Sequence, residues 1–89
     1  MAKRPKEADF LANRLRALRE QAGLTQERFA EHAGISYKVY QSFEAGRRWN
    51  LEMKTIIKLA GIHGLNLSEL FAAKAPRTKL KTERKQALQ

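Results

Sequence analysis

Cysteine is absent from the 89-residue sequence, which excludes disulfide bonds and thiolate metal sites and suits a reducing compartment. Long apolar runs are also missing, because no stretch approaches the roughly 18 residues of a membrane-spanning helix. The basic start MAKRPKEADF lacks the apolar segment of a signal peptide. We therefore expect a cytoplasmic protein that has no membrane partner.

Residues that perform catalysis or bind metals are scarce. Asp9 is the only aspartate, and His32 and His63 fall in different predicted helices with no carboxylate cluster at ligand spacing. The sequence has no glycine-rich phosphate loop. It therefore predicts that the protein is not an enzyme and has no catalytic residues, no metal site and no cofactor.

Negative charge is in short supply, since 9 acidic residues accompany 18 lysines and arginines and the net charge is +9. This excess favours a polyanionic partner such as a nucleic acid. The excess is greatest at the end of the chain, where residues 74–89 carry six cations and one anion. We expect a basic N-terminal arm over residues 1–8, one small domain over residues 9–72, and a basic, flexible tail over residues 73–89.

The central stretch from Leu24 to Gly46 predicts two short helices joined by a tight turn. Thr25 and Ser36 are good N-caps, because a side-chain oxygen can accept from the free N–H groups of a first helical turn. Gly34 lies between them and can adopt the left-handed conformation that ends a helix. So few linking residues force a sharp angle between the two helices.

The second helix of this pair has two different faces at helical spacing. One face is expected to pack and carries Val39, Tyr40, Phe43 and Glu44. The opposite arc offers hydrogen-bonding side chains from Tyr37, Lys38, Gln41 and Ser42. Gly46 is expected to end the helix, and Arg47 and Arg48 follow where the helix dipole favours cations.

Three further helices complete an all-α prediction. Asp9 is the expected cap of the first, which buries Leu11, Leu15, Leu18 and Ala22 and turns Arg14, Arg16, Arg19 and Glu20 outward. Asn50 is the expected cap of the fourth helix, whose buried stripe is Met53, Ile56, Ile57 and Ala60. In the fifth, Asn66 and Glu69 form a capping-box pattern ahead of Leu70 and Phe71.

The segments LRALREQAGLTQERFAEHAGISYKVYQSFEAGRR and IIKLAGIHGLNLSELF resemble the lambda-repressor and Cro type (XRE) of helix-turn-helix domain over about residues 9–72. The markers are the GLTQ entry, the spacing of Ala30 and Gly34, the FEAG ending and the LSELF segment. The resemblance implies a compact five-helix fold with the helix-turn-helix at helices 2 and 3. It also implies a homodimer that binds a double-stranded DNA operator of a bacterium or phage.

The same resemblance assigns functional positions along the chain. It implies base contacts in the major groove from Tyr37, Lys38, Gln41 and Ser42, and phosphate contacts from Gln26, Ser36, Arg47 and Arg48. It further implies a salt bridge between Arg19 and Glu44, which ties the first helix to the end of the recognition helix. The leading interpretation is a small dimeric repressor of prophage, restriction-controller or antitoxin type.

Two residues depart from the family pattern, and one alternative function stays open. His63 stands where an apolar residue is usual, so either Ile62 or Leu65 replaces it in the core or a dimer surface is altered. Trp49 lies in a loop that is usually polar, either packed inward or beside DNA. The alternative function is an antitoxin-like protein-interaction module whose basic tail binds a partner protein.

Overall fold

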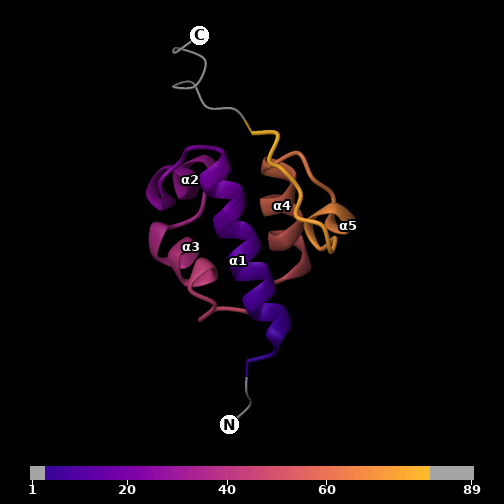
Figure 1. The fold of residues 1–89 in the computed structure, drawn as a ribbon. Helices are drawn as coiled ribbons and strands as arrows, with labels where there is room; N and C mark the ends of the chain where they lie inside the picture. Colours follow the sequence, from indigo (N-terminus) through magenta and orange to yellow (C-terminus); the bar gives the residue numbers. More distant parts are fainter. Residues whose placement is uncertain (1–3, 81–89) are drawn as a thin grey trace.

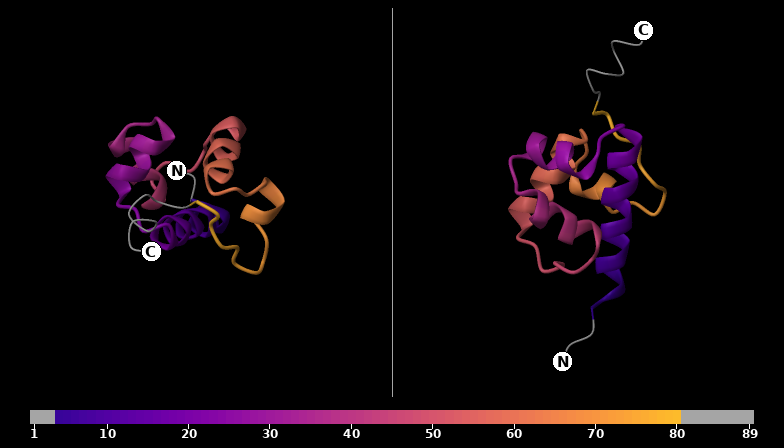
Figure 2. Two further views of the ribbon diagram at one scale, coloured as in Figure 1. Left: turned by 90° about the horizontal axis from the view of Figure 1, so that it is seen from above. Right: turned by 90° about the vertical axis from the view of Figure 1, so that its left-hand side faces the viewer.

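The computed structural model describes residues 4–80, and all regular structure in this range is helical (Figure 1). The helices are α1 (Lys6–Gln21), α2 (Gln26–Ala33), α3 (Tyr37–Glu44), α4 (Met53–Ile62) and α5 (Leu67–Leu70). In the view of Figure 1 the long α1 crosses the centre, with α2 and α3 on one side of it and α4 and α5 on the other, and Figure 2 shows that α1 lies along one face of the domain. The prediction of an all-α, five-helix domain is confirmed.

The turn between α2 and α3 forms as the sequence indicates. Thr25 Oγ1 accepts from the backbone N–H of Arg28 at 3.1 Å, and Ser36 Oγ accepts from that of Val39 at 3.1 Å. Gly34 ends α2 with φ of 71°, a left-handed conformation that favours glycine. Because only Ile35 and Ser36 separate this glycine from α3, the two helices meet at a sharp angle.

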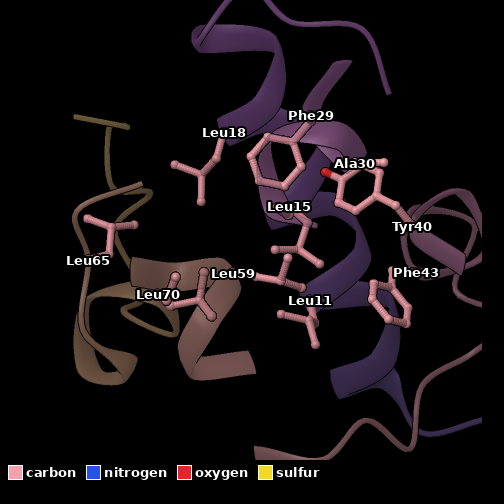
Figure 3. Packing of buried hydrophobic residues seen from close by; sticks show 12 residues of the cluster. Leu11, Leu15, Leu18, Phe29, Ala30, Tyr40, Phe43, Leu59, Leu65 and Leu70 are labelled. Atoms are coloured by element: carbon pink, nitrogen blue, oxygen red, sulfur yellow. The ribbon is translucent and has the colours of Figure 1, made fainter. Parts of the chain in front are cut away.

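All five helices contribute apolar side chains to one core, which one face of α1 covers (Figure 3). The Tyr40 ring lies 4.9 Å from the Phe29 ring and meets the Phe43 ring edge-on at 6.4 Å, measured between centroids. The packing role predicted for Tyr40 and Phe43 is therefore confirmed. This aromatic cluster fixes α3 against α2, and Leu11 and Leu15 of α1 belong to the same core.

The start of α1 differs from the prediction, because the helix begins at Lys6 and Asp9 does not cap it. Pro5 holds the N-cap position. The backbone N–H groups at the start of a helix have no carbonyl partner within the helix, so the N–H that proline lacks is not missed there. Asp9 instead lies in the first turn, and its carboxylate pairs with the guanidinium of Arg4 at 2.8 Å.

The outward position predicted for Arg14 is also wrong, since its side chain is buried. Its Nη1 donates to the carbonyl oxygens of Leu70 at 2.7 Å and Ala72 at 3.0 Å. Its guanidinium also lies 4.4 Å from the centroid of the Phe10 ring. The carbonyls at the end of α5 therefore replace water around a buried cation.

The predicted cap and buried stripe of α4 need correction. Glu52, not Asn50, holds the N-cap position, and its side chain makes no capping hydrogen bond. Met53 and Ile57 remain 60% and 52% exposed, whereas Leu59 and Ala60 are buried and Ile56 packs against the core. Two sets of apolar residues on α4 satisfy helical spacing, one with Met53 and Ile57 and one with Ile56, Leu59 and Ala60. The packing of α4 against the other helices buries the second set.

His63 is itself part of the core. Its ring is fully buried and stacks on Phe29 with centroids 5.1 Å apart, while Leu65 is buried beside it. Its Nδ1 lies 2.6 Å from Thr78 Oγ1, and its carbonyl accepts from the backbone N–H of Lys79 at 2.8 Å. Burial lowers the pKa of His63 to about 4, so the ring is neutral near pH 7.

Residues 73–80 run back along the domain and do not form a helix. Besides the contacts with His63, the backbone N–H of Thr78 donates to Gln21 Oε1 at 2.8 Å, and Leu80 packs against the core. The chain division at residues 8 and 72 stays a prediction, although packed contacts occur beyond residue 72. The last part of the predicted tail, residues 81–89, lies outside the described residues.

Candidate nucleic-acid interface

The outer arc of α3 carries the side chains to which the sequence assigned base contacts. Tyr37 is 43% exposed, Lys38 is exposed, and Gln41 and Ser42 are half-buried. The opposite side of the helix is fixed by the buried residues Tyr40, Phe43 and Glu44. A short helix held rigidly on one side thus presents an aromatic ring, an ammonium group and an amide on the other.

Ser42 is less free than its three neighbours on this arc. Its hydroxyl donates to the Val39 carbonyl oxygen at 2.6 Å, a bond within its own helix, and Arg48 Nε lies 3.4 Å from the same oxygen. The hydroxyl hydrogen is therefore already used. Ser42 offers an incoming group only the remaining acceptor capacity of its oxygen.

A buried ion pair joins α1 to the end of α3. Arg19 Nε donates to Glu44 Oε2 at 2.7 Å and Arg19 Nη2 to Glu44 Oε1 at 3.0 Å, a two-pronged arrangement. The Arg19 side chain is 12% exposed and that of Glu44 is 1% exposed, so the pair is largely shielded from water. The outward position predicted for Arg19 is likewise wrong.

Burial alone would raise the pKa of Glu44, but the hydrogen bonds from Arg19 and its neighbours outweigh burial and lower that pKa. The hydrogen bond to Glu44 raises the pKa of Arg19. Both groups therefore stay ionised inside the domain. Burial also raises the pKa of the Tyr40 hydroxyl, which remains protonated beside them.

Gln26 joins this network from the first residue of α2. Its Nε2 donates to Glu44 Oε1 at 3.0 Å. A carboxylate accepts and does not donate, so this contact fixes which end of the Gln26 amide faces inward. The residue expected to support a phosphate contact is thereby held by the end of α3, a link across 18 positions that local sequence does not indicate.

The other positions assigned to phosphate contacts lie at the two ends of α3. Ser36 caps the N-terminus of the helix, where free N–H groups and the dipole favour an anion. Arg47 and Arg48 are exposed, and their backbone N–H groups donate to the Ser42 carbonyl at 3.0 and 3.3 Å. Trp49 follows them and is also exposed.

Two further arginines, Arg4 and Arg16, reach the C-terminal end of α3. The sequence did not single out Arg4, and it predicted only an outward position for Arg16. Arg4 Nη1 donates to the Gly46 carbonyl oxygen at 2.9 Å, and Arg16 Nη2 donates to the Glu44 carbonyl oxygen at 3.0 Å. Only their basic character could have drawn attention to them, because both contacts join residues far apart in the chain.

No three acidic or histidine side chains between residues 4 and 80 come together as a candidate metal site. No helix in the same range is long and apolar enough to cross a lipid bilayer.

A sharp helix-turn-helix with a rigid, polar outer helix flanked by cations defines a DNA-binding class of domain. A family model described as a helix-turn-helix domain matches residues 12–76, and the chain belongs to this family. The predicted membership of the XRE/Cro-like group is confirmed by this match. Comparisons with curated proteins and with solved structures gave no match.

Proposed function

We propose that the protein is a sequence-specific transcriptional regulator, a small dimeric repressor that reads the major groove of double-stranded DNA with α3. The single observation that carries this proposal is the rigid outer arc of α3, where Tyr37, Lys38 and Gln41 face solvent between a helix N-terminus and a basic loop. A prophage, restriction-controller or antitoxin setting fits such a protein. Its place of action is then the cytoplasm, at the nucleoid.

Base readout rests on side chains that match base edges. The Gln41 amide can form two hydrogen bonds with adenine, and the Lys38 ammonium can donate to guanine. Tyr37 packs on a thymine methyl group or donates to a phosphate, and Ser42 contributes an acceptor. Each well-formed pair gives about 1 to 3 kcal/mol of discrimination against the wrong base.

Phosphate contacts set the register of α3 in the groove without selecting a sequence. The N-termini of α2 and α3 supply free N–H groups next to Gln26 and Ser36, and Arg47 and Arg48 supply charge. Because Glu44 holds Gln26, the α2 phosphate contact and the recognition helix move as one unit. This coupling supports a fixed docking geometry.

Dimer formation is supported by an exposed aromatic pair away from the α3 arc. The rings of Phe10 and Phe71 stack with centroids 6.3 Å apart, and both side chains remain partly exposed. A second copy would cover this apolar surface. In the dimer, the two recognition helices would then read half-sites about 34 Å apart, one turn of DNA.

A binding titration against fragments of the host genome tests the proposal. We expect at least one fragment to bind about tenfold more tightly than random DNA at moderate salt. Lys38→Ala and Gln41→Ala should relax base preference, whereas Arg47→Ala should weaken binding to all sequences. Lys54→Ala, which removes an exposed cation from α4, is the matched control. Unchanged base preference in the first two variants would show that the recognition face is assigned wrongly.

Oligomeric state provides a separate test of the dimer. Sedimentation equilibrium of the full chain should give the mass of two copies, and Phe71→Ser should shift it toward one. Met53→Ser, at another exposed apolar side chain, should leave the mass unchanged. A monomeric wild-type protein at every concentration would rule the dimer out.

A further inference from the structure

We propose that Arg4 and Arg16 form, with Arg47 and Arg48, a phosphate-binding cluster at the C-terminal end of α3, in which Asp9 holds Arg4 until a DNA phosphate replaces it. The inference rests on the proposed function, because it adds residues to the same DNA surface. It assigns a ligand-exchange role to a carboxylate that the sequence placed only as a helix cap.

Three segments meet at this end of α3. Arg4 comes from the arm before α1, Arg16 from within α1, and the remaining arginines from the loop after α3. Figures 1 and 2 show that this loop passes alongside the N-terminal half of α1. The hydrogen bonds of Arg4 to the Gly46 carbonyl and of Arg16 to the Glu44 carbonyl fix the meeting point.

The local electrostatics favour cations here. The last carbonyl groups of a helix lack helical donors and carry the negative end of the dipole. Arg16 donates to one such oxygen, that of Glu44, and Arg4 donates to the Gly46 carbonyl just beyond the helix. Each guanidinium has further N–H groups that point elsewhere. Within residues 4–80, Arg16 makes no other side-chain hydrogen bond, so most of its donors are available to a ligand.

Gly46 makes room for this arrangement as well as turning the chain. Its φ is 73°, which a side chain would strain, and a Cβ built on it would lie 2.9 Å from Arg4 Nη1. Any side chain at position 46 would therefore displace the guanidinium from the carbonyl. Gly46 therefore has two roles, because it allows the turn that ends α3 and it leaves space for Arg4 to reach that end of the helix.

Asp9 is a replaceable partner for Arg4. The two side chains are 55% and 42% exposed, and an ion pair in contact with water contributes only about 0 to 1 kcal/mol. The Glu44 carboxylate cannot take the same role, because it is turned to Arg19 and Gln26. A DNA phosphate presents two unesterified oxygens that a guanidinium binds in the same forked geometry as a carboxylate, and it carries the same single negative charge.

The test measures binding of the full-length chain to a random-sequence DNA duplex over a series of salt concentrations. Asp9→Asn should tighten binding by up to about fivefold at low salt, the value of a weak exposed ion pair. Glu7→Gln is the matched control, because it removes the same charge from the same first turn of α1 without an ion pair to Arg4. The gain from Asp9→Asn should vanish when Arg4→Gln is also present.

The arginines are tested by the slope of affinity against salt. Arg4→Gln and Arg16→Gln should each reduce the slope by about 0.9, the contribution of one phosphate contact. Arg77→Gln, an exposed arginine in the segment after α5, should leave it unchanged. Thermal unfolding of each variant shows whether the fold is intact, and Asp9→Asn supplies a result even where an arginine variant is unstable.

Two results would overturn the inference. One is equal DNA affinity of Asp9→Asn and Glu7→Gln, unchanged when Arg4→Gln is added. Such a result would mean that removing any negative charge has the same effect. The other is an unchanged salt slope in both arginine variants. If the wild-type protein binds DNA and these variants bind it with unchanged affinity and salt slope, this inference alone fails. If the wild-type protein binds no DNA, the proposed function fails as well.

Discussion

The side of the domain that holds α2 and α3 contains a buried carboxylate, that of Glu44. The side that holds α4 and α5 contains a buried imidazole, that of His63. Glu44 accepts hydrogen bonds from Arg19 and Gln26 and stays ionised. His63 has one side-chain partner, Thr78, and its Nε2 has none among the described residues. The buried carboxylate keeps its charge because donors surround it, whereas burial keeps the imidazole neutral because no anion among residues 4–80 lies beside it to stabilise the protonated ring.

Removal of the partner of Glu44 should have the largest effect on stability. Arg19→Met leaves an unpaired buried carboxylate and also removes the bond to the Leu24 carbonyl, so we expect about 3 to 5 kcal/mol of destabilisation. Denaturant unfolding measures it. Arg28→Met, the same change at an exposed arginine of α2, should cost little. A small loss in Arg19→Met would mean that the carboxylate finds water or is protonated.

The imidazole should make the protein sensitive to acid. The pKa of His63 is about 4 in the folded state and about 6.5 unfolded, so the unfolded chain binds more protons between these values. The stability contribution of the neutral ring is therefore complete above about pH 6.5 and falls by up to about 3 kcal/mol as the pH drops to 4.

Urea titrations at a series of pH values test this prediction. His63→Leu removes the titrating group, so its stability curve should be flatter than that of wild type between pH 6.5 and 4. His32→Leu, which alters an exposed histidine of α2, should retain the wild-type curve. Parallel curves for wild type and His63→Leu would show that burial of His63 does not disfavour its charged form.

The contact between residues 73–80 and His63 should have a smaller effect. Thr78→Val keeps the shape of the side chain but removes the oxygen that lies near His63 Nδ1 and accepts from the Leu80 backbone N–H. Loss of partners for buried polar groups costs about 1 to 3 kcal/mol. Thermal unfolding measures the loss, and Thr55→Val on α4 is a control. Equal stability of Thr78→Val and wild type would show that the segment only rests on the domain.

The smallest effects should come from two asparagines that the sequence treats alike. Asn66→Ala removes a capping-box acceptor for the Glu69 backbone N–H and should cost about 1 kcal/mol. Asn50→Ala should stay within about 0.5 kcal/mol, because the helix starts after Glu52. Denaturant unfolding of the pair tests this contrast. Equal losses would mean that Asn50 does stabilise the start of α4.

Local patterns were sufficient for the helix-turn-helix pair and insufficient for α4. Thr25, Gly34 and Ser36 act on N–H groups and backbone angles within a few residues, so their roles can be predicted from neighbours alone. Two apolar rows of α4 satisfy the same periodicity, and nothing in that segment distinguishes Ile57 from Ile56. Packing against the other helices made that choice.

The candidate site divides in the same way. The exposed arc of Tyr37, Lys38 and Gln41 follows from helical periodicity once the apolar face of α3 is recognised. The contacts of Gln26 with Glu44, and of Arg4 and Arg16 with the end of α3, join residues distant in sequence. A local sequence pattern does not show which residues that are distant along the chain come into contact in the folded domain.

The sequence by itself determined the helix-turn-helix, the all-α class and the excess of positive charge, because these depend on residue type and on spacing of a few positions. Tertiary structure alone decided that Arg14 is a buried cation and Arg19 a largely buried one, that His63 is a neutral core residue, and that Asp9 pairs with Arg4. The physical reason is that the cost of burying a polar group depends on which partners surround it, and those partners come from other elements of the fold.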